Sequence, residues 1–74
     1  MHRVRDESVM KAFGTHVREL RKSNGFTQES LAHKADIAFS SVARIEAGQL
    51  NTSISTIVRL ASALGVDKSE LLKF

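Results

Sequence analysis

Two short helix-like segments joined by a tight turn, within Gly25–Gly48, constrain this chain more than any other feature of its sequence. The first begins after Thr27, a favourable N-cap, and ends near Ala35. The second runs from about Phe39 to Ala47. Isolated helices shorter than roughly 12 to 15 residues are marginal in water. The two segments therefore need flanking helices to pack on.

The segment before this pair predicts one longer helix. Ser8 is the expected N-cap, and Gly25 suits the left-handed position that ends a helix. Apolar residues recur on one helical face, at Val9, Phe13, Val17 and Leu20. Gly14 weakens this helix by up to about 1 kcal/mol relative to Ala. We interpret Gly14 as a site of close packing.

The segment after the pair predicts two more helices. Ser53 is an N-cap, Gly65 ends the helix, and between them runs an apolar stripe of Ile54, Ile57, Leu60, Ala61 and Leu64. The pattern from Asp67 to Glu70 is typical of a capping box that opens a last short helix. The sequence as a whole therefore predicts an all-α, compact five-helix bundle without strands.

Within the second short segment, the buried side is defined by Val42 and Ile45. The outward side then carries Phe39, Ser40, Ala43 and Arg44. In the turn, Asp36 tolerates a left-handed conformation, although less well than Gly. Ala38 has no side-chain oxygen to cap the helix, which forgoes about 1 kcal/mol relative to Ser.

Size and composition limit the function classes. The chain has 74 residues, enough for one domain, which we place at residues 8–74 after a short basic arm or frayed helix start over residues 1–7. It has no Cys, and no stretch approaches the roughly 18 apolar residues of a membrane span. We expect a cytoplasmic protein. The net charge of +3 favours a polyanionic partner, but on charge alone a mildly basic soluble domain is the preferred interpretation.

Catalytic and metal-binding patterns are absent from the sequence. His2, His16 and His33 are scattered, and we interpret His16 and His33 as surface residues. There is no HExxH motif and no glycine-rich phosphate loop. We expect no enzyme activity, no cofactor and no metal.

From Val17 to Leu72 the chain resembles the phage repressor and Cro-type helix-turn-helix family, the xenobiotic-response-element class. The resemblance rests on LRKSNGFTQESLAHKADI, then SVARIEAGQLNTS, then LASALGVDKSELL, in the family's order and spacing. It implies a DNA-binding domain with the helix-turn-helix at about residues 27–47. The small size is similar to controller proteins of restriction–modification systems or a Cro-like regulator. An antitoxin that represses its own operon has the same appearance.

The chain departs from the family pattern at four positions. Gly is usual at Asp36, Ser or Thr at Ala38, a polar or basic residue at Phe39, and Pro is common at Thr52. The first two departures weaken the turn and the cap without changing the architecture. The third affects which bases are read.

The resemblance implies two classes of DNA contact. Phosphate contacts position such a protein, and base contacts specify sequence. Gln28 is implied as a phosphate contact, with Thr27 near it, because a helix N-terminus favours anions. The remaining phosphate candidates are explained equally well as ordinary polar residues of a loop and a solvated surface; these are Ser41, Gln49 and Asn51.

Arg44 is the expected base reader, because Arg bonds guanine O6 and N7 together; the alternatives are a phosphate contact or a solvated side chain. Ser40 is a less selective reader. Phe39 either contacts a thymine methyl or a sugar, or folds back onto Ile37 or the preceding helix. Ala43 is small enough to meet a thymine methyl.

The family pattern also implies a structural ion pair between Arg21 and Glu46 that ties the first helix to the recognition helix. We further expect a homodimer on a palindromic operator, since one monomer reads few base pairs. The interface residues that we expect are Arg59, Val66, Leu71, Leu72 and Phe74. The apolar side chains among them either form the interface or complete the monomer's core. In the antitoxin alternative, they capture a partner protein instead.

Overall fold

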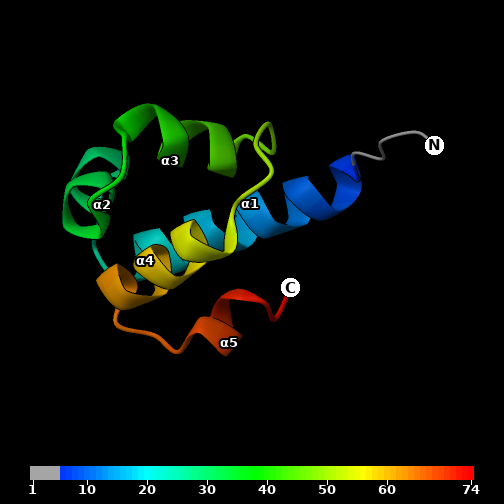
Figure 1. Ribbon diagram of the computed structural model, residues 1–74. Helices are drawn as coiled ribbons and strands as arrows, with labels where there is room; N and C mark the ends of the chain where they lie inside the picture. Colours follow the sequence, from blue (N-terminus) through cyan, green and yellow to red (C-terminus); the bar gives the residue numbers. More distant parts are fainter. Residues whose placement is uncertain (1–5) are drawn as a thin grey trace.

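The computed structural model describes residues 6–74, and this part of the chain contains five helices and no strand (Figure 1). The expected all-α five-helix bundle is confirmed. The helices are α1 (Glu7–Ser23), α2 (Gln28–Ala35), α3 (Phe39–Glu46), α4 (Ile54–Leu64) and α5 (Lys68–Leu71). Residues 1–5, on which most of the expected basic arm falls, lie outside the described residues. Over residues 6–74, no helix is long and apolar enough to cross a membrane.

α1 begins two residues earlier than the sequence predicted, and its cap is Asp6 rather than Ser8. The Asp6 carboxylate accepts from the Ser8 hydroxyl at 2.9 Å and from the Val9 amide at 3.2 Å. These two bonds hold the pKa of Asp6 below its ordinary value of 3.8. The cap's contribution to stability is therefore present above that value and is lost as the pH falls through the lowered folded-state pKa.

Two of the predicted apolar positions face solvent. Val9 is 47% exposed, and the neighbouring Met10 is buried in its place. Ile54 is 82% exposed, because it lies in the first turn of α4 at the edge of the buried face centred on Leu60 and Leu64. The helical period identified the correct faces within the helices but not at their first turns.

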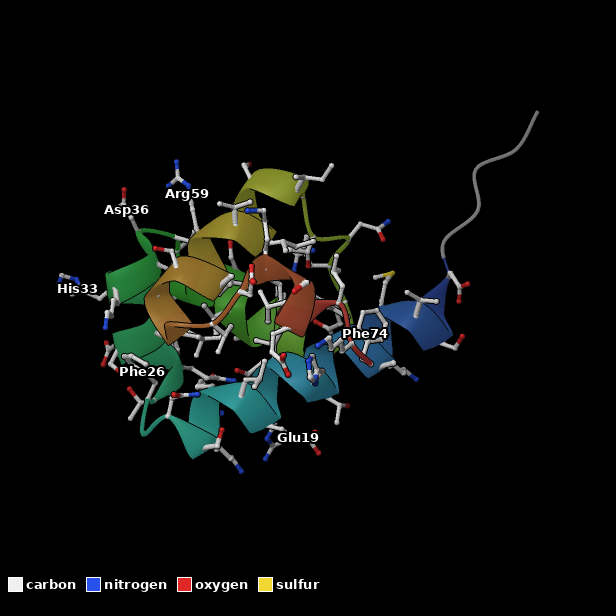
Figure 2. The ribbon with its side chains drawn as sticks, turned by 90° about the horizontal axis from the view of Figure 1, so that it is seen from below. Glu19, Phe26, His33, Asp36, Arg59 and Phe74 are labelled. Atoms are coloured by element: carbon white, nitrogen blue, oxygen red, sulfur yellow. The ribbon has the colours of Figure 1, made fainter. Side chains whose placement is uncertain are left out.

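The C-terminal segment folds back onto α1 (Figure 2). The predicted capping box at Asp67 is wrong, because α5 has no side-chain cap and spans only Lys68–Leu71. Instead, the His16 ring lies 2.7 Å from the Glu70 carbonyl oxygen, and Phe74 packs edge-on against Phe13 at 5.6 Å.

The surface assignment of His16 is therefore wrong, since its ring is half-buried. His16 shares a helical face with Phe13 and Leu20, which was the available signal. His33 is exposed as predicted.

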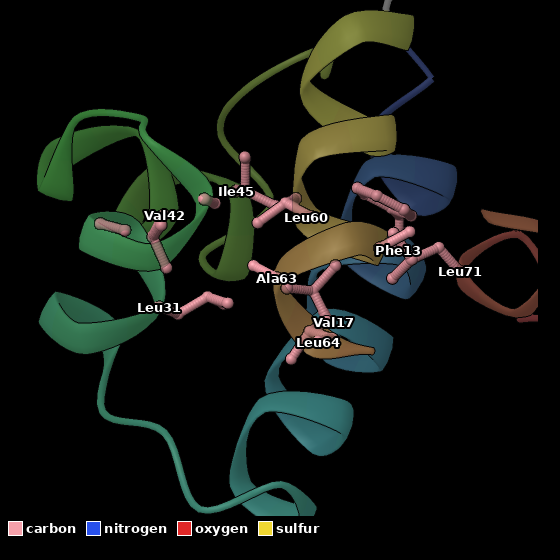
Figure 3. Packing of buried hydrophobic residues seen from close by; sticks show 12 residues of the cluster. Phe13, Val17, Leu31, Val42, Ile45, Leu60, Ala63, Leu64 and Leu71 are labelled. Atoms are coloured by element: carbon pink, nitrogen blue, oxygen red, sulfur yellow. The ribbon is translucent and has the colours of Figure 1, made fainter. Parts of the chain in front are cut away.

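The largest fully buried side chains come from all five helices: Val17, Leu31, Val42, Ile45, Leu60 and Leu71 (Figure 3). Val42 and Ile45 thus point inward, as predicted, toward a core in which α3 contacts both α1 and α2. α2 packs on α4, and α4 packs on α5. This arrangement leaves the opposite side of α3 without a covering helix (Figure 1).

Two glycines allow the backbones of α1 and α3 to approach closely. A Cβ at Gly14 would overlap the carbonyl oxygen of Ile45, which confirms the predicted close packing. Gly48 follows α3 with a φ of +72°, and a Cβ there would lie only 2.9 Å from the Cα of Lys11. Both positions require glycine because α1 lies directly against α3 and the start of the next loop.

Candidate nucleic-acid interface

The turn between α2 and α3 has the left-handed residue that the sequence predicted. Asp36 has a φ of 58° and a ψ of 47°, and the Ile37 amide after it donates to the Ala32 carbonyl oxygen at 3.0 Å. Ile37 is half-buried and packs against the core. Arg59 of α4 donates to the Asp36 carbonyl oxygen at 2.9 Å. The turn is therefore held from both sides, which fixes α3 relative to α2.

The N-terminus of α2 is capped by a reciprocal pair of hydrogen bonds. The Thr27 hydroxyl accepts from the Ser30 amide at 3.0 Å, and the Ser30 hydroxyl accepts from the Thr27 amide at 2.9 Å. Ser30 thus takes the place that Glu or Gln holds in the usual capping box. These bonds leave the first amides of α2 directed outward, next to Gln28.

The expected ion pair between Arg21 and Glu46 is present and buried. Arg21 Nε lies 2.6 Å from Glu46 Oε2, and Arg21 Nη2 lies 3.0 Å from Glu46 Oε1. The two side chains are only 10% and 3% exposed. Arg21 Nη1 also donates to the Phe26 carbonyl oxygen at 2.9 Å. One guanidinium therefore ties the end of α1 to the entry of α2 and to the end of α3.

Gln28 joins this network, which the sequence did not indicate. Its Nε2 atom donates to Glu46 Oε1 at 3.0 Å, across 18 positions of the chain. An amide nitrogen carries two protons, so one N–H of Gln28 is held by the carboxylate and the other remains for a further acceptor. Glu46 thereby fixes the side chain at the N-terminus of α2.

The outward face of α3 combines polar and apolar side chains. Ser40, Arg44 and Ala47 are exposed, and Ala43 and Ser41 are half-buried. Phe39 is 53% exposed. Over residues 6–74, six partly buried apolar side chains pack against the core, and Phe39 is not one of them; the six are Leu20, Phe26, Ile37, Leu50, Ile57 and Val66.

The loop after α3 carries the last two candidate phosphate contacts. The Gln49 amide donates to the Arg44 carbonyl oxygen at 2.9 Å, which places Gln49 directly at the end of α3. Gln49 and Asn51 are both exposed. Gln28 is bonded to Glu46, and Gln49 is bonded to Arg44, in the last turn of α3. Gln28, the outward face of α3 and the loop after it therefore lie close to one another.

The five residues expected at a dimer interface do not lie together. Leu71 is fully buried in the monomer, so its assignment to an interface is wrong; it completes the core. Figure 2 shows Arg59 beside Asp36, at the other end of the molecule from Phe74. Val66 packs against the core, whereas Leu72 and Phe74 are 57% and 52% exposed.

Leu72 and Phe74 border an apolar groove of about 190 Å³. Its lining comes from the start of α1, the loop before α4, α4 itself and the C-terminus: Val9, Met10, Phe13, Leu50, Asn51, Thr52, Ile57, Leu72 and Phe74. Val9, which the sequence placed in the core, therefore belongs to this surface.

Replacing Arg21 with Ala should lower the free energy of unfolding by about 3 to 5 kcal/mol, because Glu46 is left buried without its cation. The double replacement Arg21→Met with Glu46→Leu removes both charges and should cost much less. Urea unfolding followed by circular dichroism measures both effects. Arg18→Ala, an exposed arginine of the same helix, is the control and should stay within about 0.5 kcal/mol. An Arg21→Ala variant as stable as the parent would contradict the structural role.

The sequence of this chain is similar to those of known helix-turn-helix proteins. The helix-turn-helix family model HTH_3 matches residues 17–71. Control protein C.BamHI of Bacillus amyloliquefaciens is 38% identical over 68 residues, which cover 90% of this chain and 84% of that protein. The immunity repressor protein of Bacillus phage phi105 is 37% identical over 59 residues, covering 80% of this chain and 41% of the repressor.

The fold is also similar to that of a solved structure. The restriction-modification controller protein C.AhdI from Aeromonas hydrophila superposes with a TM-score of 0.85 at 39% sequence identity. The match covers 86% of this chain and 97% of that one. The chain belongs to the HTH_3 helix-turn-helix family of DNA-binding transcriptional regulators.

Proposed function

We propose that this protein is a sequence-specific regulator that inserts α3 into the major groove of duplex DNA. The observation that carries the proposal is the orientation of α3. Val42 and Ile45 are buried, while Ser40 and Arg44 of the same helix face solvent. The Arg44 guanidinium makes no hydrogen bond or ion pair within residues 6–74, so it is available to a base edge. Ser40, Phe39 and Ala43 complete the base-reading face.

The phosphate contacts that we propose surround this face. The positive end of the α2 dipole and its outward amides favour an anion. Gln28 stands there with one N–H held by Glu46 and the second directed to a phosphate oxygen. Thr27, Ser41, Gln49 and Asn51 are the further candidates. In this arrangement, contacts to the DNA phosphates position the protein, and α3 reads the base sequence.

We also propose that the protein acts as a homodimer on a palindromic operator. One recognition helix reads only a few base pairs, and a two-fold dimer doubles the site. The groove bordered by Leu72 and Phe74 supplies an exposed apolar surface on a small domain. Val9 extends it. The same surface supports the second candidate function, capture of a different protein as an antitoxin does.

Selection of bound sequences from random duplex DNA tests the proposed function. We expect one enriched, inverted-repeat site, with affinity that falls steeply as salt rises. Arg44→Ala should lower discrimination at one base pair per half-site by about 1 to 3 kcal/mol. Lys68→Ala removes one positive charge from α5, away from α3, and should leave the selected site unchanged. Equal affinity for all duplexes would reject the proposal.

Sedimentation equilibrium tests the proposed dimer. Leu72→Ser should shift the protein toward monomer with little loss of thermal stability, because the Leu72 side chain is more than half exposed. Phe39→Ser removes a comparable exposed apolar side chain from the other surface and should leave the dimer intact. A parent protein that stays monomeric at micromolar concentration contradicts the dimer. A stoichiometric complex with a second, different protein would then favour the antitoxin alternative.

A further inference from the structure

We propose that an apolar strip along α3, formed by Phe39, Ala43 and Ala47, recognises the 5-methyl group of thymine, and that Phe39 is the specificity-determining residue. This inference rests on the proposed function, because it requires α3 to enter the major groove. It adds the chemical identity of one base in the DNA site and makes Phe39 rather than a polar side chain its reader.

The three residues lie on one line of the helix surface. Spacings of four place Phe39, Ala43 and Ala47 above one another on the same face. Ser40 directly follows Phe39, and Arg44 directly follows Ala43, so these two polar residues form a parallel line. The outward face of α3 is therefore divided into an apolar line that begins with a large ring and a polar line that ends with a cation.

Phe39 leaves more than half of its side chain exposed in the monomer. The ring is 53% exposed and does not belong to the set of side chains that pack on the core in the described part of the chain. α3 also lacks a side-chain cap, since Ala38 precedes the ring and offers only a methyl group. The first turn of α3 thus presents apolar atoms where a polar side chain would have stabilised the helix.

The first turn is also where recognition helices meet base edges. In the major groove the apolar group on a base edge is the thymine 5-methyl; guanine, adenine and cytosine present hydrogen-bond donors and acceptors. A phenyl ring pressed against one of those polar edges would leave a buried polar group unpaired, at a cost in affinity. Thymine also presents its O4 acceptor, but its 5-methyl group gives the ring an apolar surface to bury.

The spacing between the two readers sets their separation on the DNA. Arg44 lies five positions after Phe39, and five residues rise roughly 7.5 Å along a helix. Successive base pairs are separated by about 3.4 Å. Because this rise exceeds one base-pair step, we expect Phe39 and Arg44 to read different base pairs of the same half-site.

Replacing thymine with uracil tests the inference, because uracil lacks only the 5-methyl group and keeps every hydrogen bond. The probe is the duplex that the parent protein selects from a random pool, synthesised with single thymine-to-uracil replacements and titrated by fluorescence anisotropy. We expect one position per half-site at which uracil weakens binding by about fourfold. In Phe39→Ser the thymine and uracil duplexes should bind equally, whereas Ser40→Ala should keep the difference.

Two results would overturn the inference while sequence-specific binding stands. One is parent protein that binds every uracil-substituted duplex as tightly as the thymine duplex. The other is a Phe39→Ser variant that keeps the full preference for thymine. A parent protein that enriches no sequence from the random pool would instead refute the proposed function itself, so the two failures are distinguishable.

Discussion

The buried ion pair between Arg21 and Glu46 is the interaction on which the rest of this structure depends. Arg21 closes the junction of α1 and α2 through the Phe26 carbonyl oxygen, and its two bonds to Glu46 bring the end of α3 to the same point. Glu46 also holds Gln28 at the start of α2. The gross attraction of such a pair is offset by the cost of removing both charges from water. Its main effect is therefore to select one arrangement of three helices.

That arrangement matters because α2 and α3 have eight residues each and are too short to be stable alone. They are held by α1, whose Gly14 lets its backbone touch α3, and by α4, whose Arg59 bonds to the turn at Asp36. This frame leaves the outward face of α3 without a covering helix (Figure 1). The polar line of Ser40 and Arg44 and the apolar line that starts at Phe39 are therefore available for recognition.

Much of this fold was predictable from local chemistry. The caps at Thr27 and Ser53, the left-handed Asp36 and the inward side of α3 follow from rules that act within a few residues, and the structure confirms them. Some errors were local, at the caps of Asp6 and Asp67, and the others arose where distant segments meet. Leu71 was assigned to an interface because nothing local shows that α5 closes the core. Likewise, the bond between Gln28 and Glu46 joins positions far apart in the sequence, and no motif spacing indicates it. Whether Gln28 or Arg44 contacts DNA stays a prediction.

The central claim is that the frame built on Arg21 and Glu46 presents one continuous DNA-binding surface: the start of α2, the outward side of α3 and the loop after it. Amide chemical-shift changes during titration with the selected duplex test this most directly. We expect the largest changes at Gln28, at residues 39–44 and at residues 49–51, with small changes along α5. Changes confined to α4 and α5, or no changes along α3, would contradict it.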